Sequence, residues 1–164
     1  LSFDLGGDSD QWQEQTLFDT VIGDLGDIDP RRMGREHRYC YGGHETGLAP
    51  GEQAVDFPRP PWPVSNAYVR FDVRERALDM LRLPDHVSLG ECSFVPRAPD
   101  AAEGEGYLVG VGEDLGAGKS FLVIADAMNL SAGPLAIAHV PMRAGPQVHG
   151  CWVPEGAMAL PPIA

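Results

Sequence analysis

Short apolar runs separated by turn residues dominate this chain, and no window has the sustained 3.6-residue apolar spacing of an amphipathic helix. The segment 73–83 comes nearest to helical spacing, but the polar residues around Arg74 predict two strands joined by a hairpin turn instead. Glycine, proline and aspartate separate the apolar runs, as is typical of all-β sandwiches, barrels and propellers. We therefore predict an all-β fold, with strands near residues 39–41, 67–71, 92–95, 107–111, 121–124 and 135–140.

A weak internal repeat favours the propeller among these folds. Three segments have an apolar run, an aspartate, a polar turn and a second apolar run, and they are centred on Asp4, Asp72 and Asp126. Propeller blades repeat at about 40–50 residues, so the wider spacing of these aspartates suits blades with insertions. Because a blade buries its faces only against its neighbours, roughly three blades cannot close a ring. We expect residues 1–164 to be one fragment of a single domain, without an internal boundary.

Charge and cysteine content narrow the class of protein. The chain has 12 Lys and Arg against 24 Asp and Glu, a net charge of −12, which argues against a nucleic-acid groove. Three cysteines without a C-x-x-C pair indicate neither a disulfide framework nor a zinc ribbon, and their apolar settings predict buried free thiols. No apolar run reaches about 18 residues and no signal-peptide pattern is visible, so we predict a cytoplasmic protein.

Three local motifs have ordinary structural interpretations. The run from Gly116 to Ser120 resembles the end of a phosphate-binding loop, but an apolar strand follows it where a helix is required, so it predicts a hairpin turn. Asp24, Asp27 and Asp29 do not match a calcium loop and are interpreted as a polar turn. The cation-rich run at 30–39 is compatible with an anion site, but a solvated loop paired with these aspartates is favoured.

Two residues have patterns that suit metal chemistry. His149 follows a proline-broken loop and precedes Gly150, next to Trp152, so a ring nitrogen is presented at the end of a loop. Histidine is the commonest protein ligand for metals, although a single histidine in such a setting is more often a packed one. Glu91 stands before an apolar strand, as a surface charge or as an inward group. An inward carboxylate needs a partner, which the second N–H of a metal-bound imidazole supplies.

Taken in order, four blocks of the chain resemble the C-terminal portion of the carotenoid cleavage oxygenase family, which includes bacterial lignostilbene and apocarotenoid dioxygenases. Residues 23–39 resemble that family's G-E-F-P-R-I-D-x-R-x-x-G-R…Y-R-Y block, and residues 90–97 its G-E-P-x-F-V-P-R block. Residues 106–134 resemble its D-G-[WY]-L…L-x-V-[LF]-D-A…G-P block. Residues 140–154 resemble its L-P-x-R-V-P-x-G-F-H-G-x-W block, and the match runs nearly end to end.

This resemblance implies the C-terminal part of a seven-bladed β-propeller with Fe(II) on its axis, bound by four histidines that glutamates orient. By it, His149 is the last iron ligand, Glu91 is an orienting carboxylate, and Asp24 takes the place of another. The implied partners are O₂, an apolar conjugated substrate such as a stilbene or apocarotenoid, and the upstream blades of the same protein. Any peripheral membrane contact would come from the upstream segment, and cleavage of a C=C bond would give two carbonyl products.

The chain departs from the family pattern at several positions. Asp24 stands where the family has glutamate, Gly26 and Asp27 replace Pro-Arg, and Val148 replaces an aromatic residue. The other three iron histidines belong to an upstream segment, so the fragment alone is expected to be inactive. His37, His44, His86 and His139 are interpreted as surface or packing residues. Two alternatives stay open, namely a non-catalytic propeller that binds a partner, and an enzyme with another metal or a monooxygenase outcome.

Overall fold

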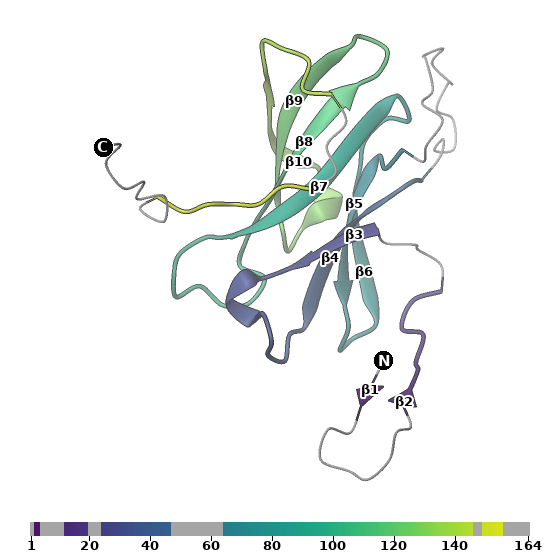
Figure 1. The fold of residues 1–164 in the computed structure, drawn as a ribbon, viewed down its shortest axis with the longest axis vertical. Coiled ribbons are helices and arrows are strands. Elements are labelled where there is room, and N and C mark those ends of the chain that lie inside the picture. The colour runs from purple at the N-terminus through teal and green to yellow at the C-terminus, as the bar shows by residue number, and fades with distance from the viewer. Residues whose placement is uncertain (1, 4–11, 20–23, 47–63, 146–148, 156–164) are drawn as a thin grey trace, which may run out of the picture.

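The computed structural model describes residues 2–3, 12–19, 24–46, 64–145 and 149–155. Within these ranges all regular structure is antiparallel β-sheet, apart from two short 3-10 helices, η1 (Pro30–Arg32) and η2 (Leu130–Ala132). β1 (Ser2–Phe3) and β2 (Trp12–Gln13) form a two-stranded sheet, and the other strands form two sheets of four (Figure 1). The predicted all-β class is confirmed. Among the described residues no helix is long and apolar enough to cross a membrane.

Each four-stranded sheet is a meander in which consecutive strands pair. The first, in order, contains β3 (Asp24–Ile28), β4 (Tyr39–His44), β5 (Ala67–Asp72) and β6 (Ala77–Arg82). The second contains β7 (Val87–Pro96), β8 (Gly106–Asp114), β9 (Lys119–Asp126) and β10 (Pro134–His139). These strands coincide with the predicted apolar runs, except that β10 ends at His139, one residue before the end of the predicted 135–140 run.

The repeated aspartates have equivalent places in the two meanders. Asp72 ends β5 and Asp126 ends β9, which are the third strands of their sheets. Tyr39 pairs with Asp72 and Tyr107 pairs with Asp126 in the respective ladders. Each unit is therefore a four-stranded meander of the kind that forms propeller blades, while Asp4 lies outside the described residues.

Side-chain and glycine geometry explains why the hairpins turn where the sequence predicts. At the β5–β6 turn, Asp72 accepts hydrogen bonds from the amides of Arg74 and Glu75. At the β8–β9 turn, Asp114 accepts the amide of Ala117, and Gly118 has a φ of 63°, which glycine adopts without strain. The 116–120 run is thus a hairpin turn followed by a strand, as predicted.

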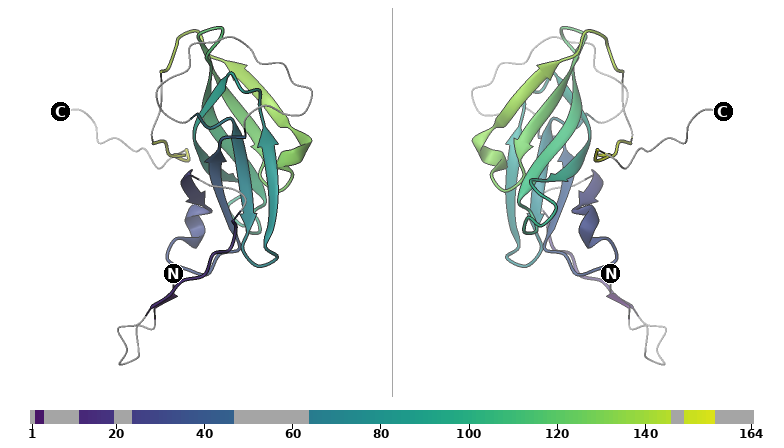
Figure 2. Two further views of the ribbon diagram at one scale, coloured as in Figure 1. Left: turned by 90° about the vertical axis from the view of Figure 1, so that its right-hand side faces the viewer. Right: turned by 90° about the vertical axis from the view of Figure 1, so that its left-hand side faces the viewer.

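The two sheets pack face to face and share one core (Figure 2). Tyr41 from β4 stacks on Phe94 from β7 with ring centroids 5.4 Å apart, and both side chains are fully buried. Tyr68, Leu108 and Val123 are also completely buried in this cluster. Burial of this apolar area is the main term that holds the two sheets together.

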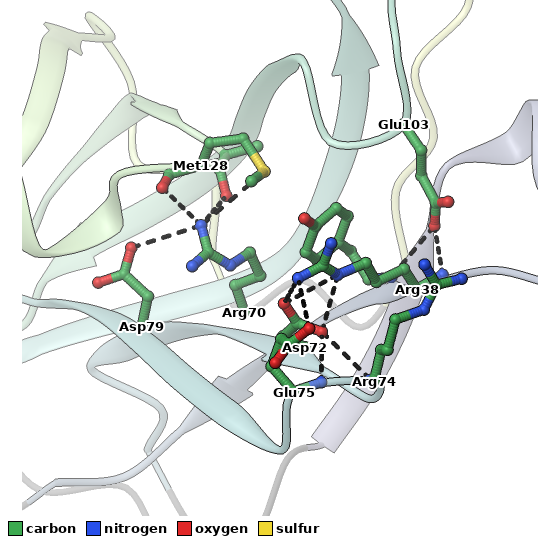
Figure 3. A network of polar contacts seen from close by, with 10 residues as sticks. Arg38, Arg70, Asp72, Arg74, Glu75, Asp79, Glu103 and Met128 are labelled. Carbon is green, nitrogen blue, oxygen red and sulfur yellow. Dashed lines mark hydrogen bonds and ion pairs between the residues drawn. The ribbon is translucent and has the colours of Figure 1, made fainter.

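Polar contacts join the same two sheets at one end of the core (Figure 3). Arg70 of β5 donates to the carbonyl oxygen of Met128 at 2.5 Å and lies 3.7 Å from a carboxylate oxygen of Asp79. Asp79 in turn accepts the amides of Leu130 and Ser131 in η2. An arginine and an aspartate of the first sheet thus bind the β9–β10 connection of the second.

The aspartate cluster at 24–29 is not the polar turn that its spacing predicts. Asp24 and Asp27 lie in β3, because this segment finds a ladder partner in β4. Asp29 caps η1, and its carboxylate pairs with the guanidinium of Arg31 at 2.6 Å. This ion pair confirms the predicted pairing of the cation-rich run with a nearby aspartate. Burial raises the pKa of Asp29, but its hydrogen bonds with Arg31 outweigh that effect and leave the pKa lowered.

The cysteine prediction is right on pairing and only partly right on burial. Cys40, Cys92 and Cys151 are all free thiols, but only Cys92 is buried, while Cys40 is half-buried and Cys151 is exposed. Burial raises the pKa of Cys92 to about 12, so this thiol stays protonated at neutral pH. The apolar neighbours of Cys151 predicted burial, but its segment 149–155 lies on the surface without regular structure.

Candidate functional site

His149 lies in the segment 149–155, which passes over β7 (Figure 1). Its side chain is 78% exposed, and its Nδ1 atom lies 3.5 Å from Oε2 of Glu91. Residues far apart in the chain, one on a strand and one on the C-terminal segment, are thus brought together. An imidazole with a carboxylate beside Nδ1 keeps a proton there and leaves the Nε2 lone pair available to a ligand.

Glu91 is held at this place by the shape of β7. The register of β7 against β8 shifts between Leu89 and Cys92, so the strand has one extra residue at Gly90–Glu91. Such a bulge changes the direction of side chains next to it, and bulges are common beside functional sites. The Glu91 carboxylate, only 16% exposed, also accepts the amide of Gly150 at 2.8 Å. It therefore binds the backbone next to His149 as well as facing the ring.

Tyr68 supports the bulge from the core. Its hydroxyl donates to the carbonyl oxygen of Gly90 at 3.0 Å, and burial raises the pKa of this phenol, so the donor proton is retained. A Cβ atom at Gly110 would stand 2.0 Å from the Tyr68 hydroxyl oxygen. Glycine at 110 is what allows the tyrosine to reach the bulge.

Asp24 is the first residue of β3, and its backbone pairs with Gly43 of β4. The register of this ladder shifts between Asp24 and Asp27, so β3 has an extra residue near its candidate carboxylate, as β7 does. The orienting role predicted for Asp24 stays a prediction, because only its backbone is described.

Asp27 is a residue of this site that sequence reasoning did not identify. Its Oδ2 atom accepts the amide of Phe94 at 2.9 Å, across the junction between β3 and β7. Burial raises its pKa, the Phe94 amide opposes that shift, and the nearby charge of Glu91 adds to it. The sequence shows the spacing of the aspartates at 24–29, but it does not show the contact of Asp27, because Phe94 is 67 residues away in the chain.

A small cleft of about 190 Å³ runs between these elements. Its lining includes the polar residues Asp27, Glu91 and Ser93, and also Trp152, which is 51% exposed, and Met33, which is 74% exposed. The cleft thus combines two carboxylates with an apolar wall. Its described lining is Asp27, Pro30, Met33, Glu91, Cys92, Ser93, Phe94, Gly150, Cys151 and Trp152.

The remaining histidines lie elsewhere. His37 contacts the carbonyl oxygen of Arg35 at 3.3 Å, and the exposed His139 on β10 packs its ring edge against Phe121. His44 ends β4 and His86 precedes β7, and none of the four is among the described residues that line the cleft. Their arrangement agrees with the interpretation as surface or packing residues.

Among the described residues, one histidine is placed to act as a single ligand of an iron site that has several nitrogen ligands, but no complete site is formed. His149 offers an exposed ring nitrogen backed by a carboxylate, which is the usual arrangement of a metal-binding histidine. Within the described ranges no three or more ligating side chains gather closely enough to hold a metal ion. Iron at this place therefore requires ligands in addition to those the structure describes.

Comparison with known proteins adds an independent line of evidence. Residues 1–154 match the family described as retinal pigment epithelial membrane protein (RPE65). The chain is 32% identical over 157 residues to the isoeugenol monooxygenase of Pseudomonas putida, covering 91% of this chain and 30% of that protein. It is 30% identical over 151 residues to lignostilbene-α,β-dioxygenase isozyme III of Sphingomonas paucimobilis, again covering 91% of this chain and 30% of the relative.

Solved structures agree with these matches. The crystal structure of Pseudomonas brassicacearum lignostilbene dioxygenase superposes with a TM-score of 0.81 at 26% identity, covering 93% of this chain and 31% of that one. A mutant of the Synechocystis apocarotenoid oxygenase superposes with a TM-score of 0.71 at 23% identity, a likeness that concerns the fold. The chain spans about 30% of the length of the curated relatives it matches.

Proposed function

This chain belongs to the retinal pigment epithelial membrane protein (RPE65) family of carotenoid and stilbene cleavage oxygenases, and on that premise we propose that it forms part of an Fe(II)-dependent dioxygenase. The whole protein would cleave a C=C bond of a stilbene, carotenoid or apocarotenoid with O₂ and release two carbonyl products. The 1–164 chain would supply one iron ligand and its supporting carboxylates.

The observation that supports this proposal most is the pairing of His149 with Glu91. The two side chains lie 3.5 Å apart although 57 residues separate them in the chain. They belong to the two sequence blocks that resemble the oxygenase family most specifically. A carboxylate beside the Nδ1 atom of an exposed imidazole is the usual arrangement of a metal-binding histidine.

In the proposed site, Nε2 of His149 would bind the iron, while Glu91 would keep the proton on Nδ1 and fix the ring orientation. Asp24 is proposed to orient a further histidine from the upstream segment. Fe(II) held there would supply the activation of O₂. The apolar side chains of Trp152 and Met33 in the cleft are compatible with an apolar conjugated substrate nearby.

The proposal also concerns partners within the same protein. Every residue of β10 is exposed, including the large apolar side chains of Leu135 at 59% and Ile137 at 43%. Propeller blades bury such faces against their neighbours. We propose that an upstream blade covers β10, that any membrane contact comes from the upstream segment, and that the protein acts in the cytoplasm without a nucleic-acid partner.

Metal content and alkene cleavage of the full-length protein test the function. We expect about one bound iron per chain, aldehyde products from a stilbene or an apocarotenoid, and loss of both in His149→Ala. Glu91→Gln should weaken iron binding by about 10–100-fold, as changes to groups that orient a ligand do. His37→Ala, a histidine outside the cleft, is the matched control and should retain iron and activity.

A folded full-length protein that binds no iron and cleaves no alkene would reject the oxygenase and favour a propeller that only binds a partner. The name of the Pseudomonas putida relative, a monooxygenase, makes the oxygen stoichiometry a separate question. Cleavage under isotopically labelled O₂ answers it. Label in both products supports a dioxygenase, and label in only one product supports a monooxygenase.

A further inference from the structure

We propose that Asp27 is a positioning residue, which fixes β7 against β3 and thereby holds Glu91 where it meets Gly150 and His149. This inference deepens the proposed function, because it concerns the same site. It rests on a contact between the two sheets that neither the sequence motifs nor the family match assigns to a role.

The first step of the argument is the place of the two strands. β3 and β7 are each the outermost strand of their sheet, so amides on the free edge of β7 have no ladder partner. A buried amide without an acceptor costs about 1–3 kcal/mol. The Phe94 amide finds its acceptor in Oδ2 of Asp27, at 2.9 Å, and this bond replaces a backbone ladder at the junction.

The second step is the short path from this bond to Glu91. Phe94 is three residues beyond Glu91, on the side of the β7 bulge where the ladder with β8 resumes at Cys92. A bulge locally removes ladder hydrogen bonds and so leaves the strand less fixed. The Asp27–Phe94 bond anchors the strand directly after that weak point, while the Tyr68 hydroxyl binds Gly90 within it.

The third step is the effect that loss of Asp27 would have on Glu91. Glu91 bears the other carboxylate of the cleft, and it accepts the Gly150 amide at 2.8 Å. Without Asp27, the Phe94 amide loses its acceptor, and a bond that fixes β7 against β3 is lost. We expect β7 to shift at its bulge as a result, which would move Glu91 away from the C-terminal segment. The Gly150 amide is therefore a direct reporter of whether Asp27 positions Glu91.

Amide hydrogen exchange on the full-length protein tests the proposal without relying on iron. In Asp27→Ala, protection should fall about tenfold at Phe94, which loses its acceptor, and also at Gly150, whose amide donates to Glu91 and not to Asp27. Asp27→Asn keeps an amide oxygen that can accept the Phe94 N–H and should restore most of the protection at both sites. Asp100→Ala, an exposed acid in the β7–β8 loop, is the control and should change neither.

Unchanged protection at Gly150 in Asp27→Ala would overturn the positioning role, even if Phe94 exchanged faster and the protein lost stability. The iron affinity of the same variants is the second measurement. We expect Asp27→Ala to weaken it about tenfold and Asp27→Asn to restore it to within about threefold of the wild type. If the wild-type protein bound no iron, the proposed function would fail, while the exchange at Gly150 would still decide the role of Asp27.

Discussion

At the scale of single residues, the candidate site depends on atoms that no motif contains. Tyr68 is completely buried, yet its hydroxyl reaches the Gly90 carbonyl next to Glu91. The absence of a side chain at Gly110 makes room for that hydroxyl. A core residue and a glycine on β8 thus support the bulge that contains Gly90, 22 residues after Tyr68, and with it the place of the adjoining Glu91.

Tyr68→Phe is expected to test this support. The variant keeps the ring in the core but leaves the Gly90 carbonyl without its donor, so the free energy of unfolding should fall by about 1 kcal/mol. Because the bulge then relaxes, iron affinity should also fall by a few-fold. Urea denaturation and iron competition on the full-length protein measure the two effects. Tyr107→Phe, a half-buried tyrosine on β8, should leave iron affinity unchanged, and an equal loss in both variants would contradict the prediction.

At the scale of elements, hairpins were predictable because their signals are local. Polar turn residues between two apolar runs predicted the β5–β6 and β8–β9 turns, and Asp72 and Asp114 bind the turn amides within three residues. The strand β3 was not predictable in this way. Its aspartates resemble a turn by spacing alone, and only the non-local ladder with β4 makes the segment a strand.

The same distinction separates the parts of the candidate site. His149 and Glu91 were identified because each lies in a recognisable block, but their contact could be seen only in the fold. Asp27 was grouped with a polar turn, since its acceptor role depends on an edge amide of another sheet. Cys151 was expected to be buried because its neighbours are apolar, whereas the C-terminal segment lies on the surface and leaves it exposed.

Arg70→Met is expected to weaken the contact between the two sheets. The arginine is only 15% exposed and donates to the Met128 carbonyl, so its loss removes this donor and also the positive charge beside the Asp79 carboxylate, which keeps the amides of Leu130 and Ser131. We expect the free energy of unfolding to fall by about 2–3 kcal/mol in urea denaturation of the full-length protein. Arg74→Met, which removes a 64%-exposed arginine paired with an exposed glutamate, should cost less than about 0.5 kcal/mol. Similar losses for the two arginines would show that the inter-sheet contact adds no stability.

At the scale of the whole molecule, the two meanders are not equally covered. The first sheet and the strands β7, β8 and β9 of the second share the buried core, whereas β10 is exposed along its full length. Leu122 on β9 is also 37% exposed and adjoins it. Exposed apolar patches of this kind mark contact surfaces. The family match over 30% of a relative's length agrees with a larger molecule in which another blade covers this face.

Ile137→Glu is the substitution that tests this arrangement. If an upstream blade covers β10, Ile137 is buried in the full-length protein, and a carboxylate there would be desolvated without a partner. The variant should then lose about 3 kcal/mol or more of unfolding free energy, or fail to accumulate as folded protein. Ile137→Ala, which creates only a cavity, should fold with a loss of about 2–3 kcal/mol. Ala117→Glu places the same charge on the exposed β8–β9 turn and should cost less than about 0.5 kcal/mol. A full-length protein that tolerates glutamate at 137 as well as at 117 would mean that β10 faces solvent, and the proposed packing of an upstream blade on this sheet would be wrong.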